Sequence, residues 1–402
     1  MFGLSRKWIA LVVVAGVLKV LLVRMNLTFD PTSDFFNWTV GTGLVFVDLT
    51  HGKLPSIAVY GAYLGIEMLL TPFYWFWTLL PTQHPSVYAM SGSSSPEAIS
   101  LVILMKLPIL LFDLAIGILL FRLVRQQTGS SRKAGVAFCA WYLNPYNAYW
   151  TVLYGGYDVI PTAFLILAVI LGSGKRWFSS GLCLSLAGFL RLFPFLAVPF
   201  FLVYALRDSI RAALKLCLSC SLPLIATFLT QVYIAGSYDA ALSELLEVPV
   251  KQSWLLYFYG ASIAGNLLKL TPFLLLVQLY LAGKYWKNES SSLTHLTTAC
   301  LLVVLGTTIY GIRGGINHLV WVTPFLAAYC ALNLDGLGLL ILTLISATLY
   351  APPISTRETE LLRPLFTGFL YGLEAAYLLK LNLDGGRIVL RRIRPSLISR
   401  AT

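Results

Sequence analysis

Long apolar stretches separated by short, basic loops are the feature that most constrains how this chain can fold. A helix needs about 20 apolar residues to cross a bilayer, and residues 100–121 and 214–234 are two of many stretches that meet this length. Strands of a membrane β-barrel alternate apolar and polar residues, whereas these stretches are apolar on every side. The pattern predicts an all-α, polytopic transmembrane helix bundle, with residues 1–402 as a single domain.

The composition agrees with a membrane protein and excludes several other classes. Of the 402 residues, 58% are hydrophobic and only 11% are charged, whereas soluble domains carry about 25% charged residues. The formal net charge is +12, which in a soluble protein would suggest a nucleic-acid partner. Here the Lys and Arg residues lie in short loops, as the positive-inside rule expects for cytoplasmic loops. We therefore expect membrane lipid as a partner, and no nucleic acid.

The positions of the basic loops predict about twelve spans, with both termini in the cytoplasm. Residues 24–99 would form a first outer loop, in which the Trp- and Tyr-rich segment 57–80 is an interfacial or re-entrant helix. Because both flanks of residues 178–206 are basic, this segment must cross twice, as two short helices that meet near Arg191 and Pro194. The predicted spans are 8–23, 100–121, 134–148, 157–172, 178–206 (twice), 214–234, 257–282, 295–311, 318–332, 337–351 and 364–381.

A carboxylate, Asp34, follows the first predicted span at the membrane surface. If this segment is helical, Asn37 and Trp38 lie on the face of Asp34, one turn further on. A carboxylate at this depth can act as a general base on a sugar hydroxyl; the alternative is that Asp34 caps the helix that follows. Asp30 precedes Pro31, a pair that favours a turn.

The predicted outer hairpin between two spans is polar, aromatic and rich in glycine. It begins at Asn144-Pro145 and ends with Tyr154, two glycines and Asp158. This composition resembles a binding surface for a planar or sugar-like group. The alternative is that Asp158 caps the span that follows.

Arg191 lies in an otherwise apolar stretch. A cation at membrane depth needs an anionic partner or a water-filled cavity. A lipid phosphate would serve, and so would an internal carboxylate such as Asp113, the clear acid at mid-span.

A second glycine-rich outer turn carries Arg313 and His318. The backbone N–H groups of such a turn, together with a guanidinium, can hold a phosphate. The alternative is that the His has a structural role.

A carboxylate, cations and aromatic hairpins therefore fall on the outer side of the predicted bundle. A base opposite a phosphate-binding cation suits transfer of a sugar from a lipid phosphate, because the nucleophile is deprotonated and the leaving phosphate is stabilised. A transporter would more often keep its acids at the bilayer midplane, where Asp113 lies. A lipid-linked substrate transporter or flippase is the alternative function.

Ordered short patterns across most of the chain resemble the glycosyltransferase C superfamily, and among its members the mannosyltransferases of the GPI-anchor and polyprenol-phosphate-mannose type. The matching residues, in chain order, are Asp34, Gly52-Lys53-Leu54-Pro55, Lys106-Leu107-Pro108 with Phe112-Asp113, Asn144-Pro145 with Gly155-Gly156-Tyr157-Asp158, Arg191 with Pro194, and His318 with Trp321, Pro324 and Phe325. Asp30 and Asp34 are spaced more widely than the Asp-x-Asp pair of many members.

The resemblance implies a membrane transferase that moves a hexose, with mannose favoured, from a polyprenyl- or dolichyl-phosphate sugar to a glycolipid or glycan acceptor. It implies that Asp34 is the catalytic base, on the outer face of a prokaryotic plasma membrane or in the lumen of the endoplasmic reticulum. Some members use a divalent metal such as Mg²⁺ or Mn²⁺, and some have a small membrane partner subunit. Non-catalytic relatives make an accessory subunit of a glycosylation complex a further alternative. The candidate substrate contacts are Asp30, Asn37, Trp38, Tyr154, Asp158, Arg191, Arg313 and His318.

Overall fold

In the computed structural model, every described element is helical, which confirms the all-α prediction for this part of the chain. The described residues are 6–25, 34–55, 64–81, 84–90, 92–191, 193–240, 292–310, 316–333, 335–347, 369–370, 372–377 and 380–381. The elements are α1 (Arg6–Met25), α2 (Asp34–Thr50), α4 (Leu64–Thr78), η2 (Val87–Met90), α5 (Pro96–Thr128), α6 (Ser131–Tyr142), α7 (Pro145–Asn147), η3 (Ala148–Leu153), α8 (Val159–Ser173), α9 (Trp177–Leu190), η4 (Phe193–Ala197), α10 (Val198–Asp208), α11 (Ile210–Ala235), α15 (Ser292–Tyr310), η6 (Ile316–Trp321), α16 (Val322–Asn333) and α17 (Gly336–Ala347).

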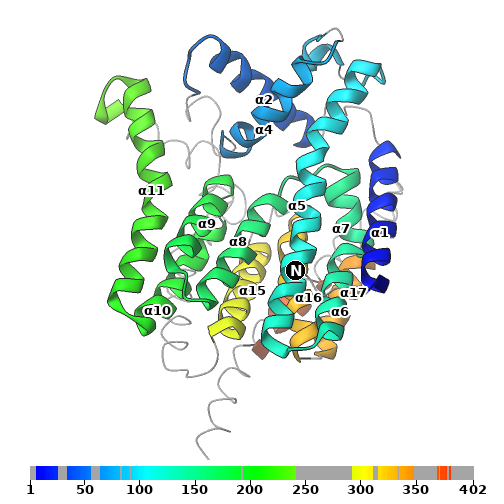
Figure 1. Ribbon diagram of the computed structural model, residues 1–402, viewed down its shortest axis with the longest axis vertical. Helices are drawn as coiled ribbons and strands as arrows, with labels where there is room; N and C mark the ends of the chain where they lie inside the picture. Colours follow the sequence, from blue (N-terminus) through cyan, green and yellow to red (C-terminus); the bar gives the residue numbers. More distant parts are fainter. Residues whose placement is uncertain are drawn as a thin grey trace, which may run out of the picture.

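The longest helix, α5, connects the layer of α2 and α4 to the rest of the bundle (Figure 1). It begins where the side chain of Ser95 accepts a hydrogen bond from the backbone N–H of Ala98, with Pro96 in the first turn. It ends at Gly129, whose φ of 66° lets its N–H bond the carbonyl of Arg125. These signals define a helix of 33 residues, long enough to cross a bilayer.

Two described helices, α5 and α11, are long and apolar enough to cross a membrane by length and composition. The number of about twelve spans stays a prediction. The shorter apolar segments are Val12–Val23, Val159–Ser173, Trp177–Leu190, Leu296–Leu305, Leu319–Asn333 and Gly336–Ala347.

The helix break that the sequence predicts within residues 178–206 is present. Helix α9 ends at Leu190, and the backbone of Arg191 is extended, with φ −153°. The chain then forms η4, which contains Pro194, before α10 begins at Val198. Two short helices therefore replace one long helix at this point.

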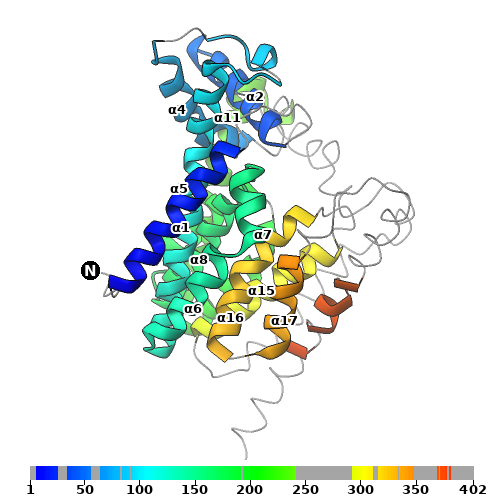
Figure 2. The same cartoon turned by 90° about the vertical axis from the view of Figure 1, so that its right-hand side faces the viewer.

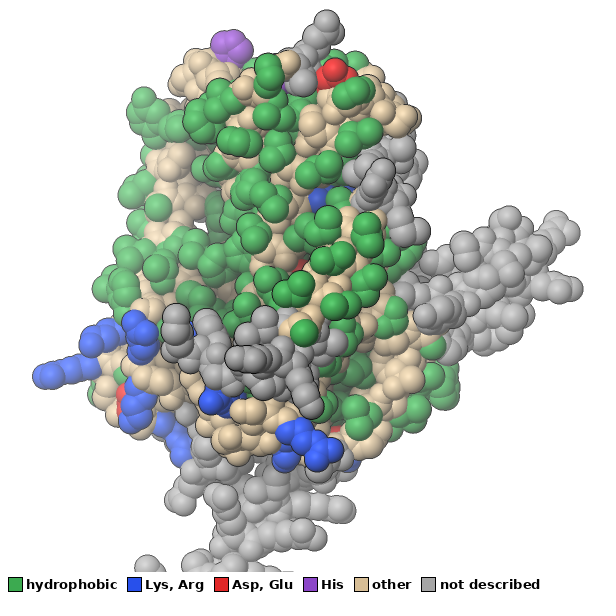
Figure 3. Space-filling model, turned by 45° about the vertical axis from the view of Figure 1, so that its right-hand side comes forward, with side chains coloured by type: hydrophobic (Ala, Val, Ile, Leu, Met, Phe, Trp, Pro, Cys, Tyr) green, Lys and Arg blue, Asp and Glu red, His purple; other side chains and the backbone are tan. Residues whose placement is uncertain are grey.

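The two ends of the molecule differ in charge. Helices α2 and α4 lie together at one end of the bundle (Figures 1 and 2). On the face shown in Figure 3, most Lys and Arg side chains gather at the opposite end. The loops that are rich in Lys and Arg follow α5, α8 and α10. Helix α4 is the described helix within the predicted segment 57–80, and it lies beside α2 at the less basic end.

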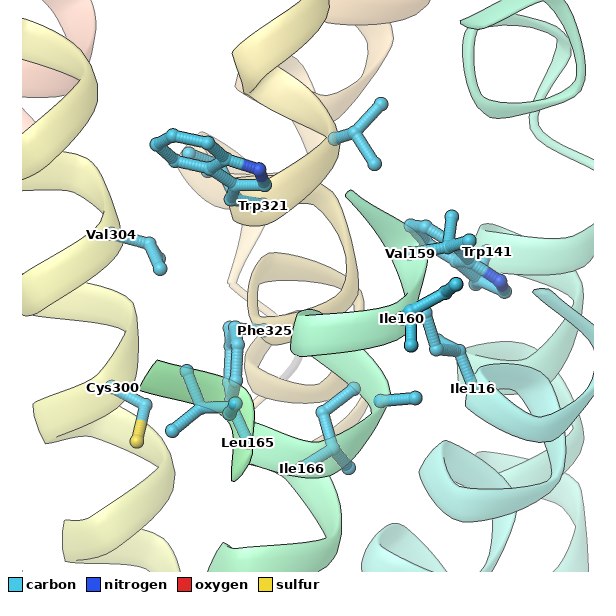
Figure 4. Close-up of a cluster of buried hydrophobic side chains, with 14 of the residues drawn as sticks. Ile116, Trp141, Val159, Ile160, Leu165, Ile166, Cys300, Val304, Trp321 and Phe325 are labelled. Atoms are coloured by element: carbon cyan, nitrogen blue, oxygen red, sulfur yellow. The ribbon is translucent and has the colours of Figure 1, made fainter. Parts of the chain in front are cut away.

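The bundle core is formed by large apolar side chains from several helices (Figure 4). Ile116 of α5, Trp141 of α6 and Phe325 of α16 are all essentially inaccessible to solvent. Lipid tails are as apolar as these side chains, so close packing, more than escape from water, holds such helices together. Gly117 allows α5 and α6 to approach, since a Cβ there would lie 2.7 Å from the ring of Phe138.

Candidate active site

The first turn of α2 packs against the turn that precedes α8. The ring of Phe35 stacks on that of Tyr157, with 6.0 Å between centroids, and Trp38 contacts the same ring at 4.9 Å. Phe35 and Trp38 are buried, whereas Asn37 is exposed. Because α2 begins at Asp34, the backbone that carries the predicted base is adjacent to this contact.

The turn before α8 has a shape that only glycine allows. Gly155 has φ +85°, and a Cβ there would lie 2.6 Å from Cδ2 of Phe35. The hydroxyl of Tyr157 donates a hydrogen bond to the carbonyl of Met105 at 3.0 Å, which fixes the turn to α5.

Arg191 and Asp158 form an ion pair beside this turn. The Nε atom of Arg191 donates to Oδ1 of Asp158 at 2.7 Å, and the two side chains are 16% and 6% exposed. The guanidinium also lies over the ring of Trp38, 5.4 Å from its centroid. Asp158 occupies the N-cap position of α8, but its side chain makes no capping hydrogen bond. The alternative prediction, that the Asp158 side chain caps this helix, is therefore wrong.

The internal carboxylate that pairs with Arg191 is thus Asp158. The prediction that Asp113 could be the partner of Arg191 is wrong. Asp113 forms an ion pair with Lys19 of α1 instead, and both side chains are buried. The ammonium of Lys19 also lies over the ring of Tyr142, 3.9 Å from the centroid. Trp141 donates to the carbonyl of Asp113. This face of α5 is therefore occupied by α1 and α6.

Lys106 is a site residue to which the sequence patterns gave no role. Its Nζ atom donates to the carbonyl of Leu153 at 2.9 Å and lies 5.4 Å from the ring centroid of Phe35. It thereby links α5 to the last residue of η3 and to the first turn of α2. The signal in the sequence was a lysine within an apolar stretch, which is costly unless it has a partner.

The Asn-Pro pattern joins the hairpin to α16. The side chain of Asn144 accepts from the N–H of Tyr146 at 2.9 Å and caps α7. Asn147 donates to the carbonyl of Trp141 and accepts from the hydroxyl of Thr323 at 2.9 Å. These contacts hold the π-helical segment η3, a helix type that occurs often at functional sites.

A ring stack brings the segment after Arg191 against η6. Phe193 and Trp321 lie 4.2 Å apart with an angle of 16° between the ring planes. The backbone of His318 is part of η6, three residues before Trp321. The elements that carry Asp34, Asp158, Arg191 and His318 therefore belong to one connected group of contacts.

The remaining predicted site residues are placed only in part. Tyr154 is half-buried, and its ring packs edge-on against Trp150 at 4.9 Å. Asp30 and Arg313 lie outside the described residues, and the side chains of Asp34 and His318 do as well. Their roles stay predictions.

The described side chains offer no group of three or more His, Cys, Asp or Glu residues that could hold a metal ion. The residues that are placed do not fit a metal centre. What they provide are cations and aromatic rings in contact with the start of α2. Buried cations of this kind can stabilise a leaving anion.

The described part of the chain is all-helical, as the glycosyltransferase C resemblance implies. Residues 93–255, less than half of the chain, match the model of glycosyltransferase family 87. The match supports the glycosyltransferase C superfamily, and the chain is a membrane glycosyltransferase and so a transferase enzyme. A comparison with curated proteins finds no match. The matched segment contains Lys106, Asn144, Asp158 and Arg191, whereas Asp34 precedes it.

Proposed function

We propose that this enzyme transfers a hexose, with mannose favoured, from a polyprenyl- or dolichyl-phosphate sugar to a glycan or glycolipid acceptor, with Asp34 as the general base. The observation that carries the proposal is the contact of the first turn of α2 with the Arg191–Asp158 pair, through Trp38. It brings the helix that carries an acid next to a buried cation. Transfer from a lipid phosphate needs both groups.

In the proposed reaction, Asp34 accepts the proton of an acceptor hydroxyl, and the oxygen of that hydroxyl forms a bond to the anomeric carbon of the donor sugar. The bond between that carbon and the phosphate oxygen breaks, and the phosphate leaves with the electron pair. Arg191 stabilises the charge of the departing polyprenyl phosphate. Asp158 positions the guanidinium by accepting from its Nε atom.

Asn37, Tyr154, Arg313, His318 and Asp30 are proposed contacts of the sugar, the acceptor or the lipid phosphate. The exposure of Asn37 and the half-buried ring of Tyr154 support this role, because both are accessible at least in part. Aromatic rings also suit the apolar faces of sugars.

The proposed orientation places the site on the outer or lumenal side of the membrane. The support is the gathering of Lys and Arg at the opposite end of the molecule (Figure 3), since basic loops remain in the cytoplasm. A lipid-linked donor would then enter from the outer leaflet.

The test is sugar transfer by purified protein in detergent, from radiolabelled polyprenyl-phosphate mannose and separately from its glucose analogue, with the corresponding nucleotide sugar as a control. We expect transfer from the lipid-linked mannose and none from the nucleotide sugar. Transfer from the nucleotide sugar alone would contradict the donor class. Preference for the glucose analogue would show that the transferred sugar is glucose, and the proposed mechanism would remain the same.

The transporter alternative predicts that Asp113 and Arg191 matter more than Asp34. Asp113 is paired with Lys19 and not with Arg191, and this pairing does not favour that alternative.

A further inference from the structure

Lys106 carries an ionisable side chain that is almost entirely buried, with 2% of its surface exposed. Lysine is seldom buried to this extent, because removing an ammonium from water is costly unless the surroundings compensate it. Two partners of this lysine, the carbonyl of Leu153 and the ring of Phe35, belong to the candidate site, which gives a reason to look for its role there.

The first contact of Lys106 is the carbonyl of Leu153, which accepts from Nζ at 2.9 Å. Leu153 is the last residue of η3. Carbonyls at the end of a helix lack a partner within the helix and carry partial negative charge, which an ammonium complements. Lys106 thus stabilises the end of the π-helical segment just before the Gly155 turn.

The second contact is the ring of Phe35, whose centroid lies 5.4 Å from Nζ. Phe35 directly follows Asp34 at the start of α2. The neighbouring residue of α5, Met105, accepts from the hydroxyl of Tyr157, and Tyr157 stacks on Phe35. One turn of α5 therefore anchors both the Gly155 turn and the start of α2.

We propose that Lys106 is a positioning residue for the transfer reaction: its buried ammonium fixes the first turn of α2, the turn that carries Asp34. This inference rests on the proposed function, in which Asp34 is the base. A general base must be held within reach of the proton that it accepts, so a shift of the first turn of α2 would lower the rate. Other charged groups beside α2 in the described residues include the Arg191–Asp158 pair, through Trp38, and Glu67 of α4, whose carboxyl lies against Gly41.

Three substitutions separate the charge from the hydrogen bond. Lys106→Gln retains a donor for the carbonyl of Leu153 and removes the charge, Lys106→Met removes both, and Lys106→Arg retains both. The matched control is Lys133→Met, because Lys133 also donates from Nζ to a backbone carbonyl, that of Leu332 at 3.4 Å, in a different part of the bundle.

The measurement is kcat/KM for sugar transfer by the wild type and the four variants. We expect Lys106→Gln to keep more of the rate than Lys106→Met, because the amide retains a donor for the carbonyl of Leu153. We also expect a loss of rate on the order of 10²-fold for Lys106→Met, as for a displaced catalytic group. Lys106→Arg should restore most of the rate, and Lys133→Met should match the wild type.

A loss of rate in Lys106→Arg as large as that in Lys106→Met would overturn the proposal, because the retained charge and donor would then have no effect. Wild-type rates in Lys106→Met would overturn it as well.

Amide hydrogen exchange of residues 35–42 in the full-length protein tests the positioning independently of activity. We expect faster exchange in Lys106→Met than in Lys133→Met or the wild type, and unchanged exchange would overturn the positioning role. If the wild type transfers no sugar, or if Asp34→Asn remains active, the proposed function fails, and the exchange result alone decides whether Lys106 holds α2.

Discussion

Single residues at the site hold one another through charge and ring contacts. Asp158 fixes one edge of the Arg191 guanidinium, and Trp38 lies against its face. Arginine suits this place because its planar group can pair and stack at the same time. Tyr157 connects the same region to α5 and to Phe35. The geometry of the site thus depends on the turn at residues 154–158.

At this scale we expect Gly155→Ala to lower both the transfer rate and the thermal midpoint. A Cβ in the left-handed conformation costs about 1–2 kcal/mol, and at Gly155 it would also lie 2.6 Å from the ring of Phe35. Gly236→Ala is the matched control, since Gly236 has φ +71° with nothing within 4 Å of the added atom. Thermal melts and transfer assays on both variants separate the two effects. An equal loss of transfer in both would contradict the role of the Phe35 contact.

Between elements, a few polar contacts fix the hairpin to the bundle. Asn147 of α7 accepts from Thr323 of α16, and the Asn is fully buried. The buried Lys19–Asp113 pair ties α1 to α5. In a membrane, such hydrogen bonds and close packing replace much of the hydrophobic drive of soluble proteins.

We expect Thr323→Val to destabilise the protein by about 1 kcal/mol, because the buried Oδ1 atom of Asn147 loses its donor. Thr343→Val is the control, because Thr343 is exposed and donates only to Leu339 of its own helix. The midpoint of thermal unfolding in detergent measures both. Equal midpoints would show that the contact between α7 and α16 adds no stability.

The sequence predicted the all-α class and the break at Arg191 because both depend on local signals. Apolar stretches define the helices, and Pro194 with a polar residue ends one of them. The partner of Arg191 and the role of Lys106 could not be read in this way. Both depend on which residues distant in the chain meet after the helices pack. Asp158 lies 33 residues before Arg191, and Lys106 lies 47 residues before Leu153.

The described part of the molecule is a helical bundle with α2 and α4 at one end and basic loops at the other (Figures 1 and 3). This polarity fits an enzyme that takes a lipid-linked donor from one leaflet. The number of spans and the single-domain organisation of residues 1–402 stay predictions from the sequence. The orientation of the chain in the membrane is a part of this predicted topology that can be measured.

We expect a cysteine at position 94, just before α5, to be accessible from the outer side, and a cysteine at position 126, in the last turn of α5, to be protected. Ser94 and Gln126 are both exposed, so Ser94→Cys and Gln126→Cys each present a reactive thiol. A membrane-impermeant maleimide on intact cells should label the first, and the second only after permeabilisation. The reverse pattern would contradict the proposed orientation.

The most direct test of the central claim compares the transfer rates of Asp34→Asn and Asp48→Asn with that of the wild type. Asp48 lies on the same helix, ~21 Å further along its axis, so the control makes the same chemical change at a distance from the site. We expect Asp34→Asn to lose transfer on the order of 10²- to 10⁴-fold while donor binding remains, and Asp48→Asn to keep its rate. Transfer by Asp34→Asn at the wild-type rate would show that another group is the base.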